Sequence, residues 1–268
     1  MTELKKRILF AIPAAIIFLG IAWLGGVYFS AVMAVLALGT IWEIDRLMKN
    51  AGFPGFFILS LIFAALLWLY PLLPPIAVAF TAAAAVLPAI ALMLPGRLTF
   101  GRRWLSTLFC AYYAPLGFLM VVLVREMGLG AEGFWLIVAL FFMIWGNDIF
   151  AYFGGKTFGK RKLAPNISPN KTWEGFGFGV LGAIVGALIT WVIADAFPES
   201  ISVVHLVVAA MITSITGPLG DLLESRLKRI AGVKDSSALL PGHGGLFDRF
   251  DALILTAPFL YFYFSFFV

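Results

Sequence analysis

The chain has 268 residues, of which 62% are hydrophobic and only 12% are charged. Charged residues usually make up about a quarter of a soluble domain. The composition therefore excludes a soluble globular protein and predicts an all-α, polytopic integral membrane protein. The formal net charge of +5 comes from 19 Lys and Arg against 14 Asp and Glu, and the placement of these charges predicts how the chain sits in the bilayer.

Apolar runs of roughly 17 to 25 residues are long enough to cross a bilayer as a helix. About nine stretches of the chain are candidates, and the third and the ninth are shorter than the others. They cover residues 8–24, 27–47, 55–70, 74–94, 104–124, 132–153, 174–196, 202–223 and 252–267. Nine spans place the two ends of the chain on opposite sides of the membrane.

The basic residues are distributed very unevenly between these two sides. Eighteen of the 19 Lys and Arg residues fall on one side, and Arg125 alone falls on the other. By the positive-inside rule the basic side is the cytosol, which predicts a cytosolic N-terminus and an external C-terminus. The basic N-terminus and the 8–24 run also resemble a signal peptide. The run is long for that role and lacks a small-x-small cleavage site, so we expect it to be retained.

The two halves of the chain differ in character. Residues 1–130 are predicted to form a transmembrane scaffold of about five helices, in which Ala and Gly allow close packing. Residues 131–268 are predicted to form a catalytic transmembrane region with cytosolic loops at 154–173 and 224–251. No inverted repeat relates the halves, which removes one mark of a secondary transporter. Cys110 is the single cysteine, so neither a disulfide nor a thiolate metal site is expected.

Asp148 lies inside the predicted 132–153 span, near its cytosolic end and beside Asn147. A carboxylate at that depth is costly unless it is paired or faces water, so intramembrane acids are candidates for function. The alternative is a residue at a helix end that is solvated from the cytosol.

The following loop mixes glycines, cations and turn residues. Gly155-Lys156-Thr157 imitates the end of a phosphate-binding P-loop, but Phe150 stands where that motif requires glycine, so the motif is excluded. Residues 168–174 place Lys171 just before a predicted helix, whose first backbone N–H groups favour anions. A basic loop that only sets the topology explains the same residues equally well.

Acidic residues gather near the carboxyl end of the chain. Asp221 and Glu224 are three residues apart, as are Asp248 and Asp251, and on a helix this spacing places each pair on one face. Mg²⁺ is bound by one or two carboxylates together with substrate phosphates. The alternatives are a solvated helix face for the first pair and, for the second, acids that favour a helix N-terminus.

The surrounding residues extend this pattern. We expect residues 217–220, Gly-Pro-Leu-Gly, to loosen the helix before the first acidic pair, as irregular backbone is tolerated where it lines a cavity. If the helix then resumes, Ser225 and Lys228 join that pair in one polar stripe. His243 stands between glycines and is not expected in a core. Further charge for phosphate oxygens comes from Lys228, Arg229, Lys234 and Arg249. The block from 221 to 251 therefore indicates a metal and phosphate site.

A longer pattern runs through the same block. Residues 225–235 read Ser, one residue, an apolar residue, Lys-Arg, four residues and Lys-Asp, and the pattern continues through Ser237, Leu240-Pro241, His243-Gly244-Gly245-Leu246 and Asp248-Arg249-Phe250-Asp251. This pattern resembles the signature of the phosphatidate cytidylyltransferase family, also called CDP-diacylglycerol synthases. Asp148 with Ala151-Tyr152, Gly155-Lys156 and residues 168–175 also look like family blocks, so the similarity covers about residues 144–251. Ile149 departs from the family, where a small hydroxyl residue commonly follows the Asp.

The resemblance implies transfer of a cytidylyl group from CTP to phosphatidic acid, which gives CDP-diacylglycerol and pyrophosphate in phospholipid biosynthesis. It implies Mg²⁺ as cofactor, with a second cation left open. The partners are then CTP, phosphatidic acid and the lipid bilayer, without nucleic acid, and a homodimer is left open. The enzyme is expected in a bacterial-type inner membrane with its active site facing the cytosol.

Carried onto this chain, the resemblance implies three groups of site residues. Metal binding is assigned to Asp221, Asp248 and Asp251, with Glu224 and Asp148 as further ligands. Catalytic roles are assigned to Asp221, Asp248, Asp251, Lys171, Lys228 and Arg229. Substrate binding is assigned to Ser168, Asn170, Lys171, Ser225, Lys228, Arg229, Lys234, His243, Gly244, Gly245 and Arg249.

Three other readings remain at this point. The same transfer to another lipid phosphate, such as an isoprenoid ether lipid, fits the same residues. A CTP-dependent polyprenol kinase, which moves the γ-phosphoryl group, also fits them. An ion or lipid transporter would explain Asp148 and a loosened 202–223 span, but it does not explain acids and bases clustered on one side.

Overall fold

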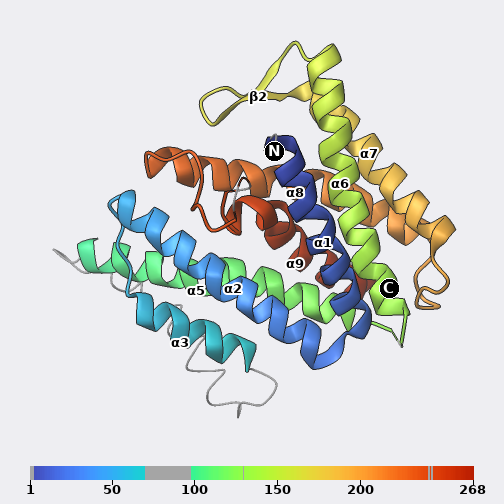
Figure 1. The fold of residues 1–268 in the computed structure, drawn as a ribbon, viewed down its shortest axis with the longest axis horizontal. Coiled ribbons are helices and arrows are strands. Elements are labelled where there is room, and N and C mark those ends of the chain that lie inside the picture. Colours follow the sequence, from blue (N-terminus) through green and yellow to red (C-terminus); the bar gives the residue numbers. More distant parts are fainter. Residues whose placement is uncertain (1–2, 70–97, 129, 241, 243) are drawn as a thin grey trace.

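The structure, a computed structural model, describes residues 3–69, 98–128, 130–240, 242 and 244–268. These residues form long helices and one short antiparallel β-hairpin (Figure 1). The elements are α1 (Glu3–Leu24), α2 (Gly26–Asn50), α3 (Phe57–Trp68), α5 (Leu98–Arg125), α6 (Glu132–Phe158), β1 (Lys162–Ala164), β2 (Ser168–Thr172), α7 (Trp173–Ile193), α8 (Val203–Ile230) and α9 (Phe247–Phe267). The predicted all-α membrane fold is confirmed.

Six of the described helices are long and apolar enough to cross a membrane, namely α2, α5, α6, α7, α8 and α9. The α3 helix has 12 residues, or about 18 Å at 1.5 Å per residue, which is less than the hydrocarbon core of about 30 Å. Eight of the nine predicted spans coincide with a described helix. The predicted span 74–94 lies outside the described residues, so the total of nine spans and the side of the N-terminus stay predictions.

The α8 helix runs without a break through residues 217–220, so the expected loosening before Asp221 is wrong. Pro218 removes one backbone donor from the helix, and neighbouring groups in a membrane protein can compensate for such a loss. Contact with the neighbouring helix accompanies this turn, since Thr216 Oγ1 lies 2.9 Å from Thr256 Oγ1 of α9.

The segments 154–173 and 224–251, predicted as cytosolic loops, contain helix ends as well as irregular chain. The 154–173 segment begins as the last turn of α6, which ends at Phe158, and continues as the β1–β2 hairpin. In the 224–251 segment, α8 continues to Ile230 and α9 begins at Phe247, which leaves residues 231–246 as the irregular stretch. The polar side chains of the last α8 turns are paired along the helix, as the Glu224–Lys228 ion pair shows, and the helix therefore persists.

The α6 and α7 helices lie side by side at one edge of the molecule (Figure 1). Glycines line their contact, and a Cβ atom added at Gly182 would overlap the carbonyl oxygen of Gly146. At Gly186 an added Cβ would likewise meet the backbone of Phe142. Small residues of this kind let helices approach backbone to backbone in a membrane.

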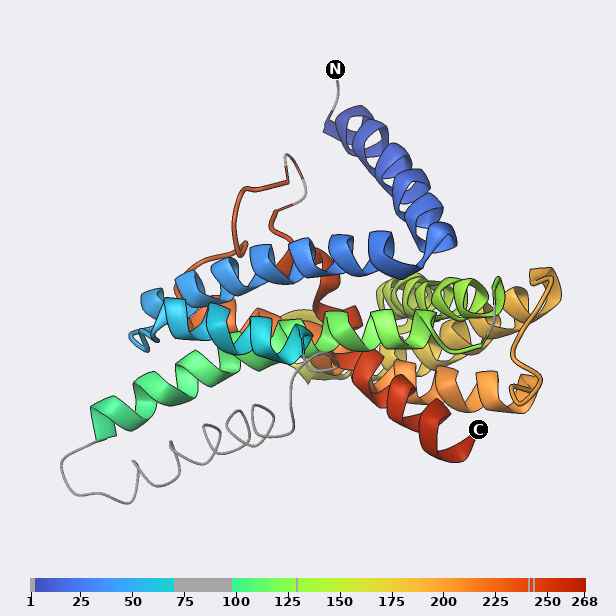
Figure 2. The same ribbon diagram turned by 90° about the horizontal axis from the view of Figure 1, so that it is seen from below.

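The α8 and α9 helices occupy the middle of the fold, and α2 and α5 cover them on the side away from α6 and α7, with α3 packed outside against α5 (Figures 1 and 2). Phe118 of α5 and Phe247 of α9 are among the largest fully buried side chains. A Cβ atom at Gly117 would lie 2.5 Å from the carbonyl oxygen of Ile254. The N-terminal helices therefore pack directly against the helix that carries Asp248 and Asp251.

Arg125, the single basic residue predicted on the outer side, ends α5 and holds the end of α1. Its Nε donates to Ala22 O at 2.6 Å and its Nη2 donates to Trp23 O at 2.9 Å. A cation near the last carbonyl groups of a helix is favourable, because those groups have no partner within the helix. The exception to the charge asymmetry therefore has a structural role.

Candidate active site

Three carboxylates from two helices meet in the middle of the fold. Asp221 and Glu224 of α8 and Asp251 of α9 each offer one oxygen, and these oxygens lie within 4.8 Å of one another. Gly220 allows this approach, because a Cβ atom there would overlap the carbonyl oxygen of Asp251. Glu224 is buried and the other two are partly buried. Three oxygen ligands at this spacing suit a hard divalent cation.

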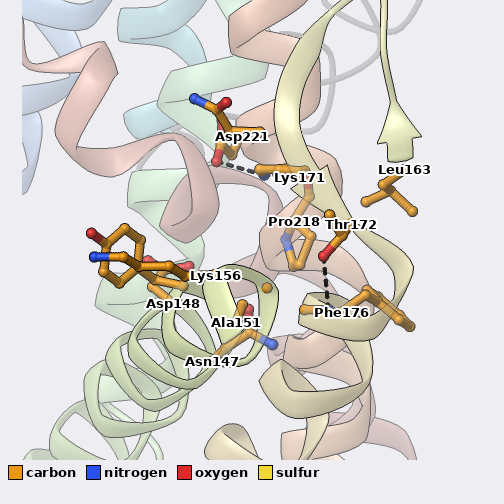
Figure 3. A pocket seen from close by; sticks show the side chains of 14 residues that line it. Asn147, Asp148, Ala151, Lys156, Leu163, Lys171, Thr172, Phe176, Pro218 and Asp221 are labelled. Carbon is orange, nitrogen blue, oxygen red and sulfur yellow. Dashed lines mark hydrogen bonds and ion pairs between the residues drawn. The ribbon is translucent and has the colours of Figure 1, made fainter. Parts of the chain in front are cut away.

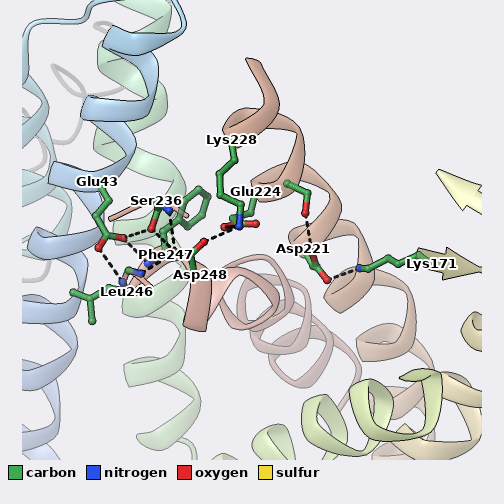
Figure 4. Close-up of polar contacts among 11 residues, drawn as sticks. Glu43, Lys171, Asp221, Glu224, Lys228, Ser236, Leu246, Phe247 and Asp248 are labelled. Atoms are coloured by element: carbon green, nitrogen blue, oxygen red, sulfur yellow. Dashed lines mark hydrogen bonds and ion pairs between the residues drawn. The ribbon is translucent and has the colours of Figure 1, made fainter. Parts of the chain in front are cut away.

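Lys171 ties the β-hairpin to this acid cluster (Figure 4). Its Nζ lies 2.5 Å from Asp221 Oδ2 and 3.5 Å from the carbonyl oxygen of Pro218. The other oxygen of Asp221 accepts a hydrogen bond from Ser225 Oγ at 3.2 Å. The sequence predicted Lys171 and Asp221 as functional residues, and the structure brings them into direct contact.

The hairpin that carries Lys171 is fixed at its base. Thr172 caps α7, since its Oγ1 accepts from the backbone N–H of Gly175 at 3.1 Å. Glu174 accepts from the backbone N–H groups of Lys160 and Arg161 at 3.0 and 3.1 Å. The backbone N–H of Gly175, one of the groups at the start of α7 that were expected to attract anions, is therefore already bound to Thr172.

Lys228 lies between two carboxylates and not at an open surface. Its Nζ is 2.5 Å from Glu224 Oε1 and 2.7 Å from Asp248 Oδ1, and its side chain is 13% exposed. The sequence assigned Lys228 to phosphate oxygens. In the structure its charge offsets the acids of α8 and α9.

The oxygens of Asp248 are surrounded by donors. Oδ1 accepts from Lys228, and Oδ2 accepts from the backbone N–H groups of Ser236 at 2.9 Å and Gly245 at 2.7 Å. Oδ2 also lies 2.9 Å from Ser236 Oγ, whose single proton it shares with Glu43 Oε2. A carboxylate has about four lone-pair sites. Asp248 therefore lies next to the group formed by Asp221, Glu224 and Asp251 without belonging to it.

Glu43 of α2 is a residue of this region that the sequence analysis missed. It is fully buried, and Ser236, Ser237 and the backbone N–H groups of Leu246 and Phe247 all donate to it (Figure 4). The signal was present in the sequence, because Glu43 and Asp45 are two acids inside the predicted 27–47 span, where acids are candidates for function.

A pocket of about 480 Å³ opens beside the acid cluster, between α6, the β-hairpin and the start of α7 (Figure 3). Asp148 and Asn147 of α6 line it, together with Lys171 and Asp221. Its lining also includes Ala151, Tyr152, Gly155, Lys156, Leu163, Asn170, Thr172, Gly175, Phe176 and Pro218. Ligand pockets typically measure about 300 to 1,000 Å³, and this pocket has two lysines and an apolar wall.

Several of the site residues predicted from the sequence line this pocket. Asp148 and Asn170 are exposed to it, and Lys156 enters it with its ammonium 5.8 Å from the centre of the Tyr152 ring. Lys156 and Tyr152 belong to the segment that resembled the family, yet no role was predicted for either. Asp148 stands in the pocket wall and not in the group of three carboxylates.

The remaining predicted residues lie around this centre. Arg229, Lys234 and Arg249 are exposed, and Ser168 is partly buried on β2. Gly244 has a φ of +82°, a backbone conformation that L side chains rarely adopt. A Cβ atom at Gly245 would lie 2.5 Å from Glu43 Oε1, so a larger residue there would displace the Glu43 carboxylate. His243 lies outside the described residues, so its predicted role in substrate binding stays a prediction.

Comparison with known proteins gives a consistent picture. The model of the cytidylyltransferase family matches residues 5–267. A phosphatidate cytidylyltransferase from Bacillus subtilis (strain 168) is 37% identical over 98% of both chains. Proteins of the same name from Brucella abortus and Staphylococcus haemolyticus are 36% and 34% identical, over 97% and 96% of this chain and 93% and 97% of theirs. The similarity therefore extends well beyond the 144–251 region.

Proposed function

The chain belongs to the cytidylyltransferase family, and we propose that it transfers the cytidylyl group of CTP to phosphatidic acid. The products are CDP-diacylglycerol and pyrophosphate. The relatives named phosphatidate cytidylyltransferase support this substrate pair over nearly the whole length of the chain. The six long apolar helices agree with an enzyme whose lipid substrate lies in the bilayer.

The proposal rests mainly on Asp221, because this residue belongs both to the pocket and to the acid cluster. It lines the pocket and also belongs to the group of three carboxylates. A nucleotide in the pocket would therefore place its phosphates next to the carboxylates. Anionic phosphates beside three acids require a cation between them, and Lys171 is already paired with one of these acids.

The donor set fits Mg²⁺. Asp221, Glu224 and Asp251 would hold the cation through oxygen atoms alone, which is the ligand chemistry that Mg²⁺ prefers. The charges agree, because Lys171 pairs with Asp221 and Lys228 is shared between Glu224 and Asp248, while Asp251 adds a further acid beside them. When bound, such an ion neutralises phosphate oxygens and stabilises the leaving pyrophosphate.

The rest of the site would position the two substrates. Lys171 and Lys156 would hold phosphate oxygens of CTP in the pocket, and exposed Arg229, Lys234 and Arg249 would attract the anionic substrates towards it. Ser168, Asn170, Ser225 and the glycines at 244 and 245 would shape the walls. Asp148 would add negative charge to the pocket wall.

The reaction needs no general base. The phosphate of phosphatidic acid has a second pKa of about 6, so an anionic oxygen is available as the nucleophile at cytosolic pH. That oxygen forms a bond to the α-phosphorus of CTP while the bond from this phosphorus to the β-phosphate oxygen breaks. The electron pair leaves with pyrophosphate. The protein contributes alignment and charge neutralisation, which are the main sources of catalysis in phosphoryl-type transfers.

We also propose that the site faces the cytosol of a bacterial-type inner membrane. The basic side of the chain includes Lys160, Arg161 and Lys162 at the start of the hairpin and the exposed cations of the 229–249 region. By the positive-inside rule this side faces the cytosol. CTP would then enter from water, and the lipid would enter sideways from the inner leaflet.

The test is a labelling experiment with the purified full-length protein in mixed micelles of phosphatidic acid and detergent. With CTP labelled at the α-phosphate, we expect label in the lipid fraction, and with γ-labelled CTP we expect none. Label from the γ-phosphate would indicate a lipid kinase. Stronger labelling of an isoprenoid ether lipid phosphate would assign the same reaction to another acceptor. No lipid label with either nucleotide would refute the proposal.

A further inference from the structure

Glu43 connects the N-terminal helices to the catalytic segment through four hydrogen bonds. Its Oε1 accepts from Ser237 Oγ at 2.6 Å and from the backbone N–H of Leu246 at 2.9 Å. Its Oε2 accepts from Ser236 Oγ at 2.9 Å and from the backbone N–H of Phe247 at 2.7 Å. One buried carboxylate therefore holds both ends of the 236–247 segment.

The charge of Glu43 is compensated by this arrangement. Leu246 and Phe247 begin α9, and the first N–H groups of a helix have no partner within it and carry partial positive charge. A neutral side chain would offer fewer acceptors to the same four donors. An acid at position 43 therefore caps α9 from a helix about 200 positions earlier in the sequence.

The same segment holds Asp248. The Ser236 hydroxyl lies 2.9 Å from both Glu43 Oε2 and Asp248 Oδ2, and Gly245, which packs on Glu43, donates its N–H to Asp248. Asp248 in turn holds Lys228, which contacts Glu224 of the acid cluster. A continuous chain of contacts therefore runs from Glu43 to the carboxylates beside the pocket.

We propose that Glu43 is a positioning residue for the transfer reaction, which acts through Ser236 and Gly245 on Asp248 and through Lys228 on the acid cluster. This inference rests on the proposed function. Glu43 does not line the pocket, so it contributes to the arrangement of the reacting groups and not to contact with substrate. Removal of a supporting residue of this kind typically lowers activity by about 10- to 100-fold.

The primary test compares Glu43→Gln with wild type in the full-length protein. The variant keeps the size of the side chain but replaces one acceptor oxygen by a donor that faces Ser236 and Phe247 or Ser237 and Leu246. We expect kcat for lipid labelling to fall about 10- to 100-fold, with the KM for CTP changed less than about threefold because the pocket is intact. Wild-type kcat in a folded Glu43→Gln protein would overturn the proposal.

Asp45→Asn is the matched control, because Asp45 is a buried acid two residues further along α2 and pairs with Lys49. We expect its kcat to stay near that of wild type. Equal loss of kcat in both variants would show that any buried acid of α2 is needed, and this would overturn the specific role of Glu43.

A double-mutant cycle with Ser236→Ala distinguishes a specific effect of Glu43 from a general loss of stability. If Glu43 acts through Ser236, the Glu43→Gln/Ser236→Ala protein should lose clearly less activity than the product of the two single losses, since residues in one network are non-additive. Independent, multiplying effects would contradict the proposed chain of contacts.

Hydrogen–deuterium exchange gives a readout that does not depend on activity. In Glu43→Gln we expect faster exchange in peptides that cover residues 236–250, and unchanged exchange in the α6–α7 pair. Unchanged exchange at 236–250 would overturn the positioning role. Wild-type protein that labels no phosphatidic acid would instead refute the proposed function, so the two failures are distinguishable.

Discussion

Lys171 Nζ lies 2.5 Å from Asp221 Oδ2, and this ion pair joins the β-hairpin that follows α6 to the C-terminal half of α8. The two residues come from the two separate blocks of sequence that suggested a phosphate site and a metal site. Their contact makes these blocks one site, in which the lysine borders both the acid cluster and the pocket.

Replacing Lys171 by alanine should lower kcat/KM for CTP by about 100-fold, comparable to the loss of one preorganised donor to a transition state. The physical reason is that the lysine proposed to hold the substrate phosphates is lost while Asp221 keeps its negative charge. Steady-state lipid labelling over a range of CTP concentrations measures the effect. Lys162→Ala removes an exposed lysine from β1 of the same hairpin and should change kcat/KM less than about threefold. Similar values for both variants would argue against a specific role for Lys171.

Asp221→Asn and Asp251→Asn should each reduce activity by more than about 100-fold, because loss of a cation ligand costs at least as much as loss of its supporting residues. Chelation with EDTA should abolish lipid labelling by the wild type, and Mg²⁺ should restore it. The exposed acid Asp195 provides the control, and Asp195→Asn should label lipid at the wild-type rate. Full activity in the presence of excess EDTA would refute the cation assignment.

Asp248→Asn separates two roles for this residue. Asp248 accepts from Lys228, Ser236 and Gly245, so we expect the variant to lose about 10- to 100-fold in kcat through displacement of Lys228. If it acts only in this way, the Mg²⁺ concentration at half-maximal activity should stay within about threefold of wild type. A titration that shows a much higher Mg²⁺ requirement would instead support the direct ligation predicted from the sequence.

Gly182→Ala should destabilise the protein by about 1–3 kcal/mol, which is the usual cost of overpacking a tight contact. The added methyl group would lie 2.7 Å from Phe150 Cβ and would overlap the backbone of Gly146. Thermal unfolding in detergent, followed by intrinsic fluorescence, measures the change. Gly177 lies on the same helix with open space around it, so Gly177→Ala should leave the unfolding temperature nearly unchanged or raise it slightly. Equal behaviour of the two variants would contradict the close α6–α7 packing.

The helices of this protein could be predicted from its sequence because every backbone polar group in a membrane must find its partner inside the fold. Long apolar runs therefore become helices, and eight predicted spans coincide with described helices. The pairs Asp221/Glu224 and Asp248/Asp251 could also be predicted, since a spacing of three residues along one helix is local information. The sequence did not predict that Glu224 would lie with Asp221 and Asp251 while Asp248 lies beside them. The contact between α8 and α9 that unites them depends on Gly220, whose role became visible only in the structure.

The supporting interactions could not be predicted in the same way. Glu43 and Phe247 meet although about 200 residues separate them, and no local pattern links them. The four donors around Asp248 depend on the conformation of residues 231–246, which have no regular periodicity. The expected break at Pro218 did not occur, because the local preference of proline carries no information about the packing of α8 against α7 and α9.

The link between Arg125 and the last turn of α1 bears on the order in which the protein is made. The carbonyl groups of Ala22 and Trp23 receive their hydrogen bonds from a guanidinium that the ribosome adds about 100 residues later. These two hydrogen bonds can therefore form only after α5 has been synthesised, and until then water can serve the last carbonyl groups of α1.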